Sequence, residues 1–333
     1  MRDSGQKERH DSAREAMMPI PTLERLVAAA RAAGPLRVAV AAAENDTALA
    51  AAALAVRQRI AEIVLVGDPQ AIRARLAAAG EDPADFSVEP AESDADAARR
   101  AVAMVRGGEA AVLMKGRLPT GELLRAVLDR EGGLRAGRLL SDVLVADHPL
   151  SERPRLLGVT DGGVNVAPTL PQKKEIVANA VRLFQALGYA RPKVACLCAV
   201  ETVSEVMAAT KDAQALAEAN ARGELPGCVV SGPLALDNAL SPEAARAKGI
   251  DHPVAGHADV LLVPTIETGN ALGKAFTYLA RRHVGHVIVG ALAPVLIPSR
   301  VERAEDKIYS IALGVLAAAS ERWRREGGGR ERP

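Results

Sequence analysis

The sequence predicts an α/β protein built on a parallel sheet, and three observations support this prediction. Short apolar, often β-branched runs alternate along the chain with longer Ala-rich segments of helical period. Most of the short runs are apolar throughout, which is typical of parallel strands covered on both faces. Hydrophobic residues make up 49% of the 333 residues, enough for a large core. Strand–helix alternation at this length favours right-handed crossovers and two domains.

The expected strands follow one another along the whole chain. In order, they are Leu36–Ala42, Ile63–Val66, Ala111–Met114, Leu139–Val145, Leu156–Thr160, Val194–Val200, Cys228–Ser231, Asp259–Val263 and His286–Leu292. The apolar residues of Gln172–Leu187 recur at helical spacing and predict a helix, with Gly188 as its C-terminal cap. A long last helix is expected from about Arg303 to Trp323.

The chain is expected to form a tail and two α/β domains. Residues 1–18 carry charges where a signal peptide would be hydrophobic, so we expect a disordered tail. The first domain is predicted to comprise residues 19–137 and 297–333, and the second residues 138–296. Because the chain would cross into the second domain and return, both crossings would lie near one cleft.

Charge and composition exclude several classes of partner. The chain has 42 Lys and Arg against 41 Asp and Glu, whereas nucleic acid or an anionic membrane would favour a basic excess. Aromatic residues are only 2%, too few to stack many bases. No apolar run reaches the roughly 18–20 residues of a bilayer span. The three cysteines are an odd number and favour a reducing compartment, so a cytoplasmic location is expected.

The familiar nucleotide and nucleophile motifs are absent from the sequence. It has no GxxxxGK loop, and residues 41–46 read AAAEND where a dinucleotide-binding protein would have GxGxxG. A GxSxG elbow is also missing, so covalent catalysis is not indicated. No metal site is predicted either. Cys196 and Cys198 are interpreted as packing residues of a strand, His252 and His257 as residues of a solvated loop, and His283 and His286 as helix-end residues.

Two polar stretches follow apolar strands, at the strand ends where open α/β sheets bind ligands. In Val159–Pro168, Thr160, Asp161 and Asn165 surround two glycines, and the alternative is an ordinary Asp-Gly turn. In Pro264–Tyr278, Gly269 and Asn270 are expected to open a helix whose free N–H groups favour an anion. The alternative there is a simple helix cap.

A third stretch, Ile297–Ile308, allows two interpretations. Ser299 with Glu302 three residues later would form a capping box for the last helix, leaving Arg300 solvated. The functional alternative has Arg300 binding a phosphate or a developing carbonyl charge, with Asp306 facing the same cleft.

The chain resembles the phosphate acetyl/butyryl transferase family over most of its length, and the butyryl branch most. The matching segments are LMKG (113–116), TGELLR (120–125), VTDGGVNVAP (159–168), AVETV (199–203), SGPLALDNALSPEAARAKGI (231–250), GHADVLLVPTIETGN (256–270) and SR (299–300). The resemblance implies the reaction acyl-CoA + phosphate ⇌ acyl phosphate + CoA. It also implies two domains with a cleft, like those of isocitrate and isopropylmalate dehydrogenases, and a homodimer or larger oligomer joined through the second domain.

The resemblance assigns roles to individual residues. Ser299, Arg300, Asp306 and Arg125 match residues that bind the phosphate and acyl carbonyl and help to deprotonate the CoA thiol. Substrate binding is expected at Lys115, Thr160, Asp161, Asn165 and Asn270. Coenzyme A is a substrate, and no cofactor or metal is expected.

Two differences from the acetyl branch of the family favour butyryl-CoA, or a similar short-chain acyl-CoA, over acetyl-CoA as the substrate. The Tyr-x-Leu-Arg-Lys stretch of the acetyl branch has no counterpart, and residues 94–106 stand in its place, with Arg99 or Arg100 as a substitute arginine. LMKG also replaces that branch's Ser-Gly-Ala. The alternatives are phosphate acetyltransferase activity, a non-catalytic acyl-CoA-sensing module, and a metal- and NAD-dependent dehydrogenase. The last would need a partner aspartate where Ser310 stands.

Overall fold

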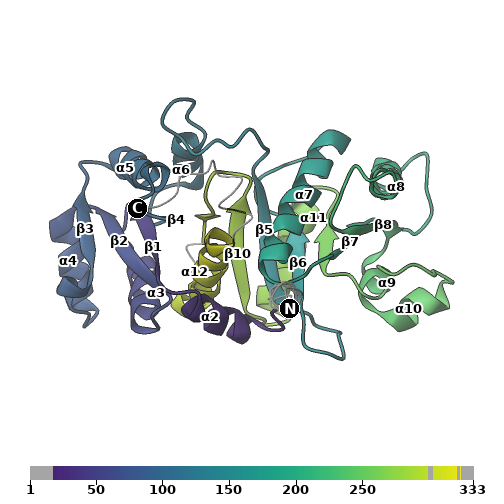
Figure 1. Ribbon diagram of the computed structural model, residues 1–333, viewed down its shortest axis with the longest axis horizontal. Coiled ribbons are helices and arrows are strands. Elements are labelled where there is room, and N and C mark those ends of the chain that lie inside the picture. The colour runs from purple at the N-terminus through teal and green to yellow at the C-terminus, as the bar shows by residue number, and fades with distance from the viewer. Residues whose placement is uncertain (1–17, 299–302, 321–322, 324–333) are drawn as a thin grey trace, which may run out of the picture.

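The protein is built on one continuous eleven-stranded sheet in the order β3-β2-β1-β4-β11-β10-β5-β6-β9-β7-β8. The structure is a computed structural model and describes residues 18–298, 303–320 and 323. Figure 1 shows the sheet running along the long axis of the molecule, with β3 and β8 at its two ends. The strands are β1 Leu36–Ala41, β2 Ala61–Gly67, β3 Ser87–Pro90, β4 Val112–Lys115, β5 Ser141–Asp147, β6 Leu156–Thr160, β7 Lys193–Leu197, β8 Val229–Leu234, β9 Val260–Leu262, β10 Val284–Val289 and β11 Val295–Leu296.

The expectation of a wholly parallel sheet is wrong at its centre. β5 pairs antiparallel with both β6 and β10, and β10 pairs antiparallel with β11. For the β5–β6 and β10–β11 pairs the physical reason is the length of the connections, because residues 148–155 and 290–294 are too few for a crossover and suffice only for a hairpin. As a result, the parallel strands on the two sides of the centre run in opposite directions. The short strands β3 and β11 were not expected from the sequence.

Helices cover both faces of this sheet. They are α2 Leu23–Ala32, α3 Asp46–Arg57, α4 Pro69–Ala78, α5 Asp94–Gly107, α6 Thr120–Val127, α7 Leu170–Ala186, α8 Ala208–Ala221, α9 Leu236–Leu240, α10 Pro242–Ala247, α11 Ile266–Lys274 and α12 Ala304–Ala319, with the short helical turns η1 Pro83–Asp85 and η2 Ala275–Leu279. Gly188 follows α7 with φ +89°, as its predicted capping role requires. No helix within these described residues is long and apolar enough to cross a membrane.

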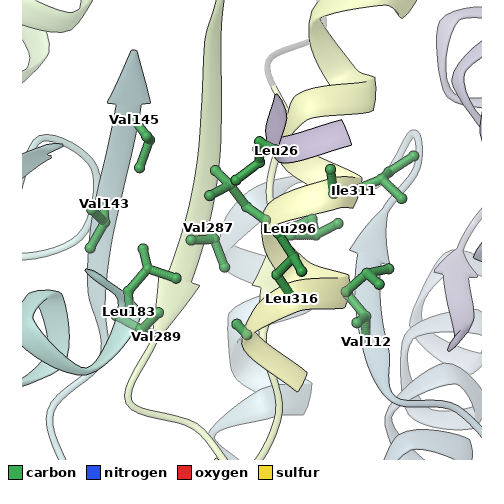
Figure 2. Packing of buried hydrophobic residues seen from close by; sticks show 14 of the residues in the cluster. Leu26, Val112, Val143, Val145, Leu183, Val287, Val289, Leu296, Ile311 and Leu316 are labelled. Carbon is green, nitrogen blue, oxygen red and sulfur yellow. The ribbon is translucent and has the colours of Figure 1, made fainter. Parts of the chain in front are cut away.

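One face of the sheet is closed by a single hydrophobic cluster that extends along its whole length. Val143 and Val145 of β5 and Val287 and Val289 of β10 point to this face and are at most 5% exposed. Figure 2 shows them beside residues of α2, α7 and α12, which cover the centre of the sheet. α12 also packs on α3, so the end of the chain returns to its first half. The predicted boundaries of the two domains stay a prediction, because the sheet has no break.

On the opposite face the hydrophobic side chains form two separate clusters. One lies under α5 and α6 over β1, β2 and β4, and the other under α9, α10 and α11 over β6, β7 and β9. The alternation of side chains along each strand places Ala39 and Ala41 of β1 on this face and Val38 and Val40 on the closed one. The two clusters meet over the antiparallel centre of the sheet.

Candidate active site

A cavity of about 900 Å³ lies where the two clusters meet. The central strands form its floor, with Asp142 and Leu144 from β5, His286 and Ile288 from β10, and Val159 from β6. The antiparallel pairing brings these residues together, because Leu144 lies opposite both His286 and Val159 in the registers. The floor therefore combines an apolar surface with one carboxylate and one imidazole.

Both halves of the chain supply the walls of this cavity. The first half contributes Lys115, Pro119 and Thr120, between the end of β4 and the start of α6. The second half contributes the turn after β6 and one side of α11 and η2. Ile297, Pro298 and the first turn of α12 complete the wall.

Asp161 organises the turn that follows β6. It is 2% exposed, and its carboxylate accepts hydrogen bonds from the backbone N–H groups of Gly163 (2.9 Å), Val164 (2.9 Å) and Asn165 (3.1 Å). The Asn165 side chain donates to Asp161 Oδ2 (2.5 Å) and to the Leu140 carbonyl (2.8 Å). Burial and the nearby carboxylate of Asp142 raise the pKa of Asp161. These contacts give both residues a positioning role, as in the Asp-Gly turn alternative.

Thr160 and Asp142 connect this turn to the floor. The buried Thr160 hydroxyl donates to the Asp142 carbonyl (2.8 Å). The Asp142 carboxylate lies 3.6 Å from Nδ1 of His286, and a Cβ on Gly163 would lie 3.0 Å from Asp142 Oδ2. The turn therefore approaches the carboxylate closely, which glycine permits.

Gly162 and Gly269 allow the two polar stretches to pack backbone against backbone. A Cβ on Gly269 would lie 2.6 Å from Gly162 Cα, and one on Gly162 would lie 2.8 Å from the Gly269 carbonyl carbon. Both distances are too short for any side chain larger than hydrogen. The two motifs, more than a hundred residues apart, are thus fixed against each other at the cavity.

The prediction that Gly269 and Asn270 open a helix is wrong. α11 begins at Ile266, with Thr265 at its N-cap, and the Gly269 N–H already donates to the Thr265 carbonyl (3.2 Å). The Thr and Glu residues before the glycine provide good helix-start chemistry, so the helix begins a turn earlier. Asn270 nevertheless lines the cavity.

Asp306 lies in the first turn of α12 and lines the cavity. Its Oδ1 lies 2.5 Å from Nδ1 of His283, and its Oδ2 lies 3.7 Å from Nε of Arg303. His283 and His286 were expected to be helix-end residues, but one contacts Asp306 and the other lies on the cavity floor. The sequence did not show this because β10 and α12 come together only in the fold.

The remaining predicted site residues differ in their placement. Lys115 is 4% exposed and lines the cavity, where its Nζ donates to the carbonyls of Gly116 (3.1 Å) and Leu118 (3.4 Å). Arg125 is exposed on α6 and is not among the lining residues. Ser299 and Arg300 lie outside the described residues. Because α12 begins at Ala304 with Arg303 at its N-cap, the capping box predicted for Ser299 and Glu302 is not the start of this helix.

The structure adds lining residues that the sequence analysis did not identify: Asp142, His286, Lys274, Tyr278, Arg281 and Arg303. Asp142 and His286 lie in strands whose other residues are mostly apolar. A polar residue inside an apolar strand sequence is unusual, and this feature could have indicated them as site residues. Among the described residues, no group of three His, Cys, Asp or Glu side chains is arranged to hold a metal. Cys196 and Cys198 pack in or against the closed-face cluster, and burial raises the pKa of Cys198 to about 11.

This fold is shared with solved structures of phosphotransacylases. Among solved structures, a branched-chain phosphotransacylase from Enterococcus faecalis V583 is similar, with a TM-score of 0.75 and 30% identity over 85% of this chain and 99% of that chain. A putative 4-hydroxythreonine-4-phosphate dehydrogenase from Salmonella typhimurium shares the fold, with a TM-score of 0.55 and 12% identity over 85% of this chain and 99% of that chain. The dehydrogenase-like fold expected from the sequence is therefore confirmed.

Sequence comparisons define the family. Residues 89–315 match the model of the phosphate acetyl/butaryl transferase family. A probable phosphate butyryltransferase from Bacillus subtilis (strain 168) is 44% identical, over 84% of this chain and 93% of that protein. A phosphate acetyltransferase from Thermotoga maritima is 41% identical, over 89% of this chain and 99% of that protein. The chain belongs to the phosphate acetyl/butaryl transferase family, and it is an acyltransferase.

Proposed function

We propose that the cavity transfers a short acyl group, with butyryl preferred, directly between coenzyme A and phosphate. The observation that carries this proposal is that one cavity combines Asp306, an apolar floor and cationic side chains in a chain of this family. A phosphate oxygen attacks the acyl carbon of the thioester, the C–O bond forms, and the C–S bond breaks. The CoA thiolate leaves and takes up a proton. No enzyme nucleophile is needed.

Asp306 is the proposed acid and base for the CoA sulfur. In the direction of thioester synthesis the thiol must lose its proton, and a thiol with a pKa near 8.5 is only a few per cent ionised at pH 7. His283, 2.5 Å from Oδ1, fixes the orientation of the Asp306 carboxylate. A carboxylate held in position compensates for its modest basicity by proximity to the sulfur.

Cationic side chains are proposed to bind the phosphate and the oxyanion that develops on the acyl carbonyl. By family resemblance one of these is Arg300, with Ser299 donating a hydrogen bond. The resemblance also indicates Arg125, which does not line the cavity. Charge-assisted hydrogen bonds from a planar guanidinium suit both groups. Lys115 carries a further buried charge on the cavity wall.

The acyl chain is proposed to lie against the apolar part of the floor. Leu144, Val159 and Ile288 each line the cavity and are themselves at most 4% exposed, so they form a well-packed apolar part of the floor. One or two methylenes in such a pocket change binding by only about 1–3 kcal/mol. We therefore expect turnover of acetyl-CoA as well, at a lower rate.

The test is the release of free thiol from butyryl-CoA and from acetyl-CoA, each with and without phosphate. We expect phosphate-dependent release, faster for butyryl-CoA. Faster release from acetyl-CoA would make the protein a phosphate acetyltransferase. Tight acyl-CoA binding without release from either would contradict the catalytic proposal and favour a sensing module. The homodimer or larger oligomer and the cytoplasmic location remain predictions.

A further inference from the structure

Tyr278 is an aromatic residue whose exposure the fold does not explain. The chain has one Trp, three Tyr and three Phe, all within the described residues. Tyr278 is 64% exposed, whereas the other aromatic side chains are buried or half-buried in the packing. It lies in the π-helical turn η2, which follows α11 directly. Phe276 of the same turn is 7% exposed and packs in the core, so the turn is anchored without Tyr278.

The exposed ring stands at the cavity beside two cationic side chains. Tyr278, Lys274 and Arg281 all line the cavity, and Lys274 Nζ lies 5.9 Å from the centre of the Tyr278 ring. No carboxylate of the described part of the chain pairs with Lys274 or Arg281, although many other exposed cations of this protein are paired. Arg281 adopts φ +52°, a conformation unfavourable for a residue other than glycine. An aromatic face with unpaired positive charge beside it is suited to a ligand that has both a flat ring and phosphates.

Coenzyme A has these two features at the end remote from its thiol, in the adenine ring and the phosphates. Resting on the proposed function, we propose that Tyr278, Lys274 and Arg281 form the subsite for the nucleotide end of CoA. The Tyr278 ring stacks on adenine, and Lys274 and Arg281 bind the phosphates. The pantetheine arm then extends along the cavity toward Asp306. Because the nucleotide takes no part in the bonds that form and break, the subsite is expected to contribute mainly to the binding of CoA.

The experiment combines variants at the subsite with substrates that lack the nucleotide. The variants are Tyr278→Ala, Tyr278→Phe, Lys274→Gln and Arg281→Gln, and the matched control is Leu279→Ala, since Leu279 is 83% exposed and does not line the cavity. KM and kcat are measured with butyryl-CoA, with butyryl-dephospho-CoA and with butyryl-pantetheine. The binding of CoA and of pantetheine is measured in parallel by calorimetry.

We expect Tyr278→Ala to raise KM for butyryl-CoA by about 5- to 150-fold, the range for loss of one stacked base, with kcat little changed. KM for butyryl-pantetheine should stay within twofold of wild type, and Tyr278→Phe and Leu279→Ala should behave as wild type. At least one of Lys274→Gln and Arg281→Gln should reduce the preference for butyryl-CoA over butyryl-dephospho-CoA.

Two results would overturn the assignment. Equal losses with butyryl-CoA and butyryl-pantetheine would place Tyr278 at the reacting end or in the stability of the fold. Unchanged kinetics and unchanged CoA binding in all variants would show that the nucleotide binds elsewhere. If wild type released no thiol from any substrate, the proposed function would fail, while weaker CoA binding by Tyr278→Ala with unchanged pantetheine binding would still support the subsite.

Discussion

The two faces of the central sheet are closed to different extents, although the same strands supply both. On one face Val143, Val145, Val287 and Val289 belong to a single cluster sealed by α2, α7 and α12 (Figure 2). On the other face their sequence neighbours, such as Asp142 and His286, border a cavity of about 900 Å³. The difference arises because helices cover the second face only toward its two ends.

Polar side chains on the two faces of the sheet have different surroundings. Ser141 points to the closed face, where the buried Asn179 side chain donates to its hydroxyl (3.0 Å) and to the Leu139 carbonyl (2.8 Å). Asp142, the next residue, lines the cavity instead. On the closed face these polar side chains form hydrogen bonds within the fold. On the open face the Asp142 side chain borders the cavity. Stability and activity should therefore separate between the faces.

The strongest effect on activity is expected from Asp306→Asn at the open face. Loss of a positioned acid and base lowers turnover by about 10²- to 10⁴-fold, while the melting temperature should change little because the side chain is not part of the core. Steady-state kinetics and thermal unfolding measure the two effects. The control is Glu305→Gln, at the exposed neighbouring position, which should change neither turnover nor the melting temperature. Turnover of Asp306→Asn within a few-fold of wild type would remove Asp306 from the chemistry.

The converse variant is Phe184→Ala on the closed face. Phe184 is fully buried in α7, packs edge-on against Tyr189, and lies under Gly158 of β6. Its truncation should lower the free energy of unfolding by about 3–5 kcal/mol. Chemical denaturation measures this loss, and kcat per folded molecule should be preserved. The control Leu128→Ala, at a side chain 45% exposed, should cost far less. A large loss of kcat in folded Phe184→Ala would show that the two faces are coupled.

A smaller effect, on both stability and KM, is expected from a substitution that disturbs the backbone packing at the open face. In Gly269→Ala the new Cβ would lie 2.6 Å from Gly162 Cα, so α11 and the turn after β6 must move apart. We expect a loss of about 1–3 kcal/mol in stability, together with a higher KM because both segments line the cavity. Gly121→Ala, where a Cβ meets nothing within 4 Å, should instead be neutral or slightly stabilising. If Gly269→Ala changed neither stability nor KM, α11 and the turn after β6 would not be fixed against each other.

The sequence by itself predicted nine of the eleven strands, the last helix and the two polar stretches that meet at the cavity. These features are local, since an apolar run, a helical stripe or a glycine-rich strand end can be recognised from neighbouring residues alone. It also predicted the family, because several motifs occur in the right order. Asp306 was identified on the same basis, and it lines the cavity.

Only the tertiary structure decided which residues face each other across the cavity. The antiparallel centre, with β10 between β5 and β11, depends on pairing between strands far apart in the chain. That pairing sets the register that places His286 beside Asp142, and the return of α12 brings Asp306 to His283. A β-strand presents alternate residues to its two faces, but its sequence does not say which face the helices will leave uncovered. Coverage is a property of how all elements pack, and for this reason the open floor and the exposed Tyr278 became visible only in the fold.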